Sequence, residues 1–136
     1  MNKEEKTLQH RNINPTAMRL LVLQYLSEQK KAISLKDLEE GLFLADKSTL
    51  FRTLKTFEEK KLIHSIDDGT GAVKYALCYE NCNCAPEDIH YHFHCTKCDN
   101  TFCLDSVRAP SIELPRGFEL KQANLVIKGI CAYCNP

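Results

Sequence analysis

The sequence lacks an apolar run long enough to cross a bilayer, and its first twelve residues, MNKEEKTLQHRN, are charged and polar. A membrane-spanning helix needs about 20 consecutive apolar residues, and a secretory signal needs an apolar segment behind its charged start. Because the chain shows neither pattern, we expect a soluble, cytoplasmic protein that does not interact with membranes.

The chain also lacks net charge, since 18 Lys and Arg residues balance 18 Asp and Glu residues. Proteins that coat nucleic acid through bulk charge are strongly basic. The balance therefore argues against non-specific coating, and it leaves site-specific DNA binding to a few well-placed basic residues.

The histidine-rich stretch HYHFHC, residues 90–95, lacks the glutamate that a zinc deaminase carries in an HxE element. Tyr91 and Phe93 occupy the positions between the histidines instead. This argues against a zinc deaminase. We expect that the protein is not an enzyme and has no small-molecule substrate.

Cysteine, in contrast, is abundant, with eight in 136 residues. In a reducing compartment, CxxC pairs bind metal or carry out redox chemistry more often than they form structural disulfides. Cys95 and Cys98 form one such pair, and Cys131 and Cys134 form another. Each pair can present two thiolates to one side of a tetrahedral ion, so we predict a closed four-cysteine zinc site. The alternative is two disulfides or unused thiols.

The alternating histidines indicate a second site next to the first. If residues 90–95 form a strand, His90, His92 and His94 point to one face and Cys95 points to the other. One strand would then serve two metal sites. An exposed strand whose histidines bind nothing is the alternative, but three histidines beside a four-cysteine site favour a second metal.

Apolar spacing in the first half predicts three helices in series, over residues 15–29, from Ser34 and over 46–61. Two strands are expected after them, at 62–66 and 73–77, joined by a turn-rich run. Three helices followed by a hairpin is the order of a winged helix-turn-helix, in which the third helix enters the DNA major groove.

The predicted helix 46–61 begins DKSTLFRTLK, with Asp46 as its cap. Hydroxyls, a guanidinium and free backbone N–H groups at a helix N-terminus suit phosphates and base edges. A surface helix of this composition is more often only a solvated face. The candidate DNA-contacting residues are Lys47, Ser48, Thr49, Phe51, Arg52 and Lys55.

The stretch CYENCNCAPED is polar and contains Pro86, which is typical of a hinge. We predict an α+β protein with a winged-helix DNA-binding domain over residues 1–79, a hinge over 80–89 and a small C-terminal domain over 90–136. The C-terminal domain carries the four-cysteine zinc site.

Taken in order, the chain resembles the ferric uptake regulator (Fur) family from Pro15 to Cys134. The segments that carry the resemblance are PTAMRLLVLQYL, KSTLFRTLKTFEEKKLI, YAL, HYHFHCTKC, LPRGFEL and IKGICAYC. The resemblance implies a homodimeric, metal-dependent repressor that binds a double-stranded DNA operator, with a C-terminal α/β dimerisation domain. It also implies structural zinc on the four paired cysteines and a regulatory metal on His90 and His92.

Other ligands of the regulatory site follow from the same resemblance. Cys78 is similar to the cysteine of zinc-sensing members, whereas iron sensors often carry an acid where this chain has Ala76. Cys103 lies where many members have an acid, and His64 fits a wing-side ligand. The implied regulatory set is His64, Cys78, His90, His92 and Cys103.

Thiolates suit Zn²⁺ better than Fe²⁺. We therefore predict a zinc sensor that controls metal-uptake genes, closest in ligand pattern to the zinc uptake regulators. The alternatives are an Fe²⁺ or Mn²⁺ site, an iron- or peroxide-sensing repressor, and a structural zinc module that senses nothing.

Several positions depart from the family pattern. Ala32 and Ala123 replace histidines that many members carry, so a third metal site is not expected. Phe51 replaces a frequent tyrosine and removes a hydroxyl from the recognition helix. Cys84 is an alternative to Cys78 as a ligand. No role is assigned to Cys82 or His94.

Overall fold

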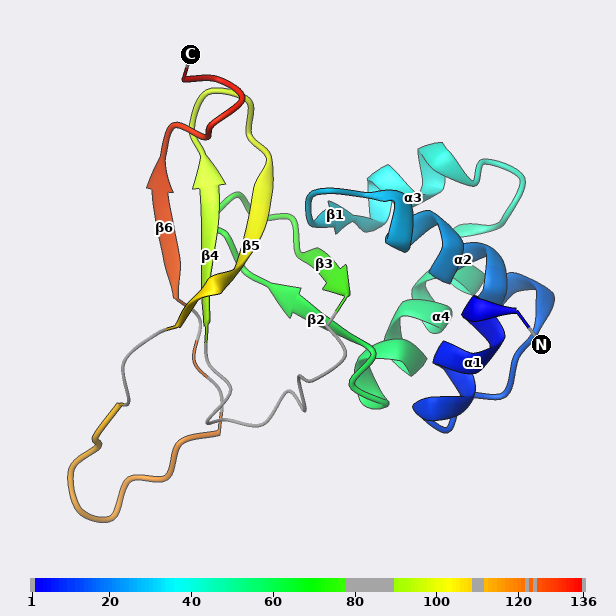
Figure 1. Ribbon diagram of the computed structural model, residues 1–136, viewed down its shortest axis with the longest axis horizontal. Coiled ribbons are helices and arrows are strands. Elements are labelled where there is room, and N and C mark those ends of the chain that lie inside the picture. The colour runs from blue at the N-terminus through cyan, green and yellow to red at the C-terminus, as the bar shows by residue number, and fades with distance from the viewer. Residues whose placement is uncertain (1, 78–89, 109–111, 122, 124, 136) are drawn as a thin grey trace.

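Helices and two three-stranded sheets make up the computed structural model of the protein (Figure 1). It describes residues 2–77, 90–108, 112–121, 123 and 125–135, and for residues 90 and 105–108 it describes the backbone only. The helices lie together on one side, one sheet lies on the other, and a hairpin lies between them (Figure 1). No helix within the described residues has the length and apolar character needed to span a bilayer.

Four helices precede the hairpin: α1 (Lys3–His10), α2 (Ala17–Glu28), α3 (Leu35–Gly41) and α4 (Lys47–Glu59). Each begins after a short polar side chain that accepts a hydrogen bond from a backbone N–H of the first turn; these caps are Asn2, Thr16, Ser34 and Asp46. Such caps satisfy N–H groups that have no partner within the helix. Ser34 and Asp37 form a full capping box, which confirms the predicted start of α3.

The first two helices differ from the sequence-based expectation. α1 was not expected, because KEEKTLQH buries a single side chain, Leu8, and has no apolar periodicity. α2 begins at Ala17 rather than Pro15, because the Thr16 hydroxyl accepts the Arg19 N–H and fixes Thr16 as the extended cap residue.

A buried apolar cluster holds the helices together. Its fully buried members include Leu8, Val22, Leu38, Leu50, Leu54, Phe57 and Ile63. Burying one such side chain stabilises the fold by about 1.5–3 kcal/mol. Val22 lies in this core, while its apolar neighbour Leu21 is 49% exposed. The core fixes one face of α4 and leaves the other face open to solvent.

The wing is formed by β2 (Ile63–Ile66) and β3 (Lys74–Leu77), which pair antiparallel as predicted, each one residue shorter at its start. A two-residue strand, β1 (Ile33–Ser34), pairs with β3 and completes the order β1-β3-β2. β1 was not predicted, because a strand of two residues is too short to show an alternating pattern. The connection between β2 and β3 turns through Gly69 and Gly71, whose φ angles of 84° and 89° favour glycine.

The second sheet has the order β5-β4-β6, with β4 (His90–Cys95) in the centre. β5 (Thr101–Arg108) pairs with β4 antiparallel, and β6 (Val126–Gly129) pairs with it parallel. The predicted strand at residues 90–95 is confirmed with the same bounds.

Candidate metal centres and DNA-binding helix

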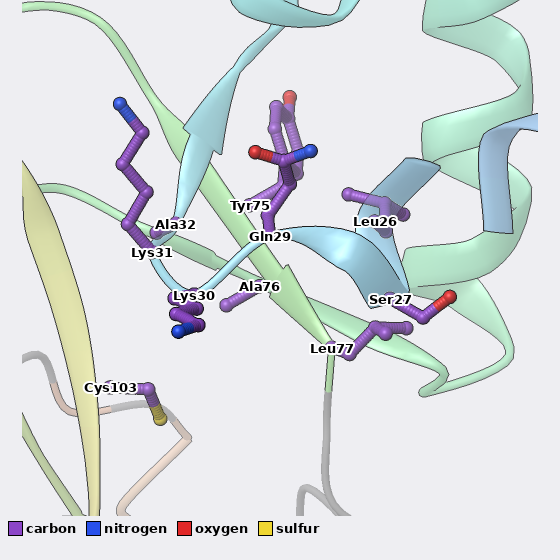
Figure 2. Close-up of a pocket in the computed structure, with 10 residues that line it drawn as sticks. All are labelled: Leu26, Ser27, Gln29, Lys30, Lys31, Ala32, Tyr75, Ala76, Leu77 and Cys103. Atoms are coloured by element: carbon purple, nitrogen blue, oxygen red, sulfur yellow. The ribbon is translucent and has the colours of Figure 1, made fainter. Parts of the chain in front are cut away.

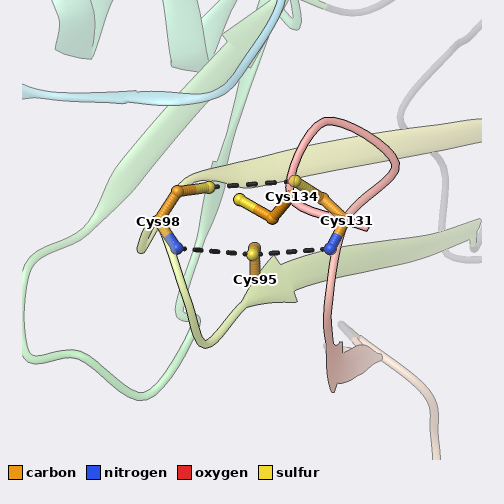
Figure 3. Close-up of side chains that lie close together, drawn as sticks. All are labelled: Cys95, Cys98, Cys131 and Cys134. Carbon is orange, nitrogen blue, oxygen red and sulfur yellow. Dashed lines mark hydrogen bonds between the residues drawn. The ribbon is translucent and has the colours of Figure 1, made fainter. Parts of the chain in front are cut away.

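Four cysteine side chains meet at one end of the second sheet (Figure 3). Cys95 ends β4 and Cys98 lies in the turn that follows, while Cys131 and Cys134 lie in the turn after β6. Because β6 runs parallel to β4 and places Gly129 beside Cys95, both turns arrive at the same end of the sheet. The four Sγ atoms lie within 4.8 Å of one another.

The geometry of this cluster fits a tetrahedral zinc ion. Cys98 Sγ lies 3.8 Å from Cys131 Sγ. Zn–S bonds of about 2.3 Å in a tetrahedron place sulfur atoms about 3.8 Å apart. The backbone N–H groups of Lys97, Cys98 and Cys131 each donate to Cys95 Sγ at 3.4 Å. Amide donors of this kind stabilise a ligating thiolate.

The pKa values of two of these thiols are shifted in opposite directions. The hydrogen bonds to Cys95, led by the Cys98 N–H, lower the pKa of its thiol. Burial and the neighbouring thiols raise the pKa of Cys134. A bound divalent cation stabilises all four thiolates, so metal binding would release protons from this cluster. The donor set is that of a structural zinc site.

A second group of donors joins the wing to the second sheet. His64 comes from β2, His92 from β4 and Cys103 from β5, and their ligand atoms lie within 4.8 Å of one another. His64 Nε2 is 3.2 Å from His92 Nε2 and 3.8 Å from Cys103 Sγ. Nitrogen and sulfur ligands around one zinc ion lie about 3.3–3.8 Å apart. The two separations from His64 Nε2 are close to these values, so the three donors lie near enough to one another to converge on one ion.

Strand pairing explains why His92 and Cys103 lie together. The two residues are directly opposite each other in the antiparallel pair of β4 and β5, so their side chains project from the same face. His92 is buried and Cys103 is half-buried. His64 reaches them from the wing, which makes the cluster a bridge between the two sheets.

Two further predicted ligands cannot be placed in the same way. His90 is the first residue of β4, two positions before His92, and its side chain lies outside the described part of the structure. Cys78 and its alternative Cys84 fall at positions outside the described residues.

A cavity of about 250 Å³ lies beside Cys103 (Figure 2). Ala32 and Ala76 contribute to its wall and offer only methyl groups. The residues that line it are Leu26, Ser27, Gln29, Lys30, Lys31, Ala32, Tyr75, Ala76, Leu77 and Cys103. Because position 76 is an alanine, it adds no carboxylate to the neighbouring metal-ligand cluster. The described donors of that cluster are two imidazoles and one thiol.

The exposed face of α4 carries most of the candidate DNA-contacting residues. Lys47, Ser48, Phe51, Arg52 and Lys55 are exposed. The Lys55 ammonium lies 5.3 Å from the centre of the Phe51 ring. Thr49 is half-buried, and its hydroxyl donates to Asp46 at 2.6 Å. That hydrogen bond lowers the pKa of Asp46, so Thr49 helps to cap the helix.

The sequence model of the ferric uptake regulator family matches residues 10–128. This chain belongs to the ferric uptake regulator family. Fur-family proteins are metal-responsive transcription regulators and not enzymes, and the predicted resemblance is confirmed.

Solved structures of Fur-family proteins share this fold. A zinc uptake regulator complexed with zinc and DNA has 26% sequence identity and a TM-score of 0.67, covering 96% of this chain and 89% of its own. Holo XcZur has 20% identity and a TM-score of 0.68, covering 96% and 92%. The ferric uptake regulator from Pseudomonas aeruginosa with manganese has 22% identity and a TM-score of 0.63, covering 96% and 99%. Among curated proteins, no sequence match was found.

These matches confirm the α+β fold with an N-terminal winged helix and a C-terminal domain in which four cysteines gather at one site. They also show that proteins of this fold occur with different metals, since the neighbours include a zinc-bound and a manganese-bound regulator. The metal of the second cluster must therefore be argued from its own donors.

Sequence reasoning missed one polar group of this Fur-family chain. Asp68 belongs to the turn-rich run between the wing strands, where an aspartate usually faces solvent. In the structure it is 1% exposed, and it accepts a hydrogen bond from Thr101 on β5. No local pattern indicates this burial, because Thr101 lies 33 residues away in the sequence.

Proposed function

We propose that this protein is a zinc-responsive, DNA-binding repressor that controls metal-uptake genes. The observation that carries the proposal is the meeting of His64 from the wing with His92 and Cys103 from the second sheet. An ion bound by all three ties the DNA-binding unit to the C-terminal unit. The four-cysteine cluster, in contrast, holds a permanent structural zinc.

The mechanism is a shift of population between domain arrangements. Without regulatory metal, each wing docks on its own C-terminal sheet only part of the time, so the two winged helices of a homodimer sample many separations. With metal, each wing is tied to its own C-terminal sheet, and the separation of the recognition helices matches two operator half-sites. A coupling of about 1–3 kcal/mol, or roughly 5- to 150-fold in DNA affinity, is enough for regulation.

The donor types favour zinc as the regulatory metal. Two imidazoles and a thiol are soft to borderline ligands, whereas Mn²⁺ and Mg²⁺ prefer oxygen donors. Zinc takes four ligands, and the described cluster supplies three. We assign the fourth position to His90 or Cys78, which the family resemblance names.

The proposal includes a division of the chain and a DNA-binding face. The winged-helix domain spans residues 1–79, the hinge 80–89 and the dimerisation domain 90–136. DNA contacts come from the exposed face of α4, with Lys47, Ser48, Phe51, Arg52 and Lys55 as the contacting residues. The similar zinc uptake regulator is complexed with DNA, which supports a DNA-binding role for this chain.

The decisive experiment measures metal content per protomer in anaerobically purified protein, before and after mild chelation, together with binding to a pool of operator candidates. We expect two zinc ions, one of which is removed easily with loss of DNA binding. One tight zinc with unchanged DNA binding would overturn the sensing proposal. DNA binding restored better by Fe²⁺ or Mn²⁺ than by Zn²⁺ would overturn the choice of metal.

Two substitutions make the result specific to the cluster. His92→Ala removes a ligand that is buried at the junction, and we expect one zinc per protomer and no metal-dependent DNA binding. His10→Ala removes an exposed histidine at the end of α1, far from the cluster, and should behave as the wild type.

A further inference from the structure

The wing touches the second sheet at two adjacent pairs of residues. His64 reaches the pair formed by His92 and Cys103. Asp68, four residues further along, reaches the next pair on the same face, formed by His94 and Thr101. Side chains alternate along a strand, so the two pairs present their side chains to the wing side by side.

The surroundings of Asp68 keep its carboxylate charged. Its side chain is fully buried, and Oδ2 accepts hydrogen bonds from Thr101 Oγ1 at 2.6 Å and Lys74 Nζ at 2.8 Å. Oδ1 accepts from the hydroxyl and the backbone N–H of Thr70, at 2.6 and 3.1 Å. Burial acts to raise the pKa of Asp68, but these hydrogen bonds outweigh it and hold the pKa well below its usual range. A buried carboxylate is stable when it is paired and bonded in this way.

Thr101 links this carboxylate to the sheet. Its hydroxyl proton points to Asp68, so its oxygen accepts from the Nδ1–H of His94 at 2.9 Å. The Thr101 carbonyl accepts the Ala32 N–H at 2.7 Å, and the neighbouring Asn100 accepts from Lys31 Nζ at 2.9 Å. The N-terminal unit therefore holds residues 100 and 101 at several points, none of which involves a metal ligand.

We propose that Asp68, Thr101 and His94 form a metal-independent latch that docks the wing on the second sheet and places His64 at the regulatory site before metal binds. Its role in sensing rests on the proposed function; its role in docking does not. Docking in advance raises the apparent metal affinity, because the apparent dissociation constant is the intrinsic one divided by the fraction of competent molecules.

The test uses two variants and one control. Thr101→Val is close to isosteric, removes the hydroxyl and keeps the backbone bond to Ala32. Asp68→Asn keeps the shape and removes the charge. Asp67→Asn makes the same change at the exposed neighbouring residue. One zinc per protomer after mild chelation verifies in each variant that the four-cysteine site, and with it the second sheet, is intact.

The first readout is amide hydrogen exchange at Ala32 in protein that carries only the structural zinc. We expect exchange about tenfold faster in Thr101→Val and Asp68→Asn than in the wild type, and no change in Asp67→Asn. Wild-type protection in both latch variants would overturn the proposal. This readout needs no regulatory metal. It therefore tests whether the latch docks the wing even if the protein senses no metal.

The second readout is competition for the weaker zinc against a chromophoric chelator. We expect the affinity to fall roughly tenfold in both latch variants, while DNA affinity at saturating zinc returns to within about threefold of the wild type. Unchanged zinc affinity in both variants, in a wild type that binds two zinc ions, would overturn the latch and leave the sensing proposal standing.

Discussion

The two clusters of metal-ligating residues differ in how the chain assembles them. The four cysteines come from two pairs, each within four residues of sequence, and both lie at one end of one sheet. His64 and His92 are 28 residues apart, and His64 and Cys103 are 39 apart, and they come from two different sheets. The cysteine cluster depends on one unit alone, whereas the histidine cluster exists only when two units are docked. Metal binding at a site that depends on docking can change how the two units are arranged. Metal binding at a site within one unit cannot.

The largest effect is expected from Cys131→Ser, which removes a buried thiolate from the cysteine cluster. Structural zinc contributes about 10–16 kcal/mol in small zinc domains, so we expect loss of zinc and unfolding of the second sheet. Metal analysis and thermal unfolding would measure both. Cys103→Ser, in the other cluster, should keep one tight zinc. A Cys131→Ser protein with full zinc content and an unchanged Tm would contradict the assignment of the structural zinc to the cysteine cluster.

A smaller effect is expected from His92→Ala. The variant should keep its structural zinc and its fold, and lose regulatory zinc affinity by roughly 100-fold or more, since one of few ligands is missing. DNA affinity at a fixed, low zinc concentration should fall by about 5- to 150-fold. Fluorescence anisotropy with labelled operator DNA measures this loss. Equal losses in His10→Ala would contradict the assignment.

Lowering the pH from 8 to 6 should weaken the regulatory site by roughly 10- to 100-fold, because His64, His92 and Cys103 must all lose their protons to bind metal. Asp68 does not contribute to this change. Its pKa is depressed, so its stabilising effect is present above its ordinary pKa of about 4 and is lost only as the pH falls below that value.

This pH dependence can be checked by chelator competition at both values, with the protection factor of the Ala32 amide, in protein that carries only the structural zinc, as the measure of docking. We expect weaker zinc binding with unchanged protection. A loss of protection in step with zinc affinity would show that the wing undocks at pH 6 and that the two effects are not separable.

The smallest effect is expected from Cys103→Asp, which replaces a thiolate with an oxygen donor. The ratio of zinc to manganese affinity at the regulatory site should fall on the order of tenfold, because carboxylates suit Mn²⁺ and thiolates suit Zn²⁺. Competition titrations with both metals measure the ratio. An unchanged ratio would show that Cys103 is a neighbour of the bound metal and not a ligand.

The structural features that could be predicted are those whose interacting residues lie close together along the sequence. The capping box of Ser34 and Asp37 spans four residues, and the wing hairpin spans fifteen, so both could be predicted from local patterns. The cysteine pairs were equally local. Leu21 and Val22 could not be told apart by spacing alone, because both are apolar neighbours and only the packing of α2 decides which one is buried.

The candidate junction was harder to predict. The histidine alternation in β4 was visible in the sequence, but His64 and Cys103 were named by the family resemblance and not by any spacing rule. Asp68 was missed, since its burial depends on Thr101 in another sheet. Local rules assign an aspartate in such a run to a turn, and they carry no information about what packs over the turn.

The parallel pairing of β4 with β6 also has a consequence for biosynthesis. The chain must extend from Cys98 to Cys131, a separation of 33 residues, before the second pair of thiols exists. At about 5–20 residues per second on the ribosome, this takes on the order of 2–7 s, during which the nascent chain carries an open pair of thiols. The central strand of the sheet gains its parallel neighbour in the same interval. Neither the four-cysteine site nor the sheet can therefore be completed before this interval has passed.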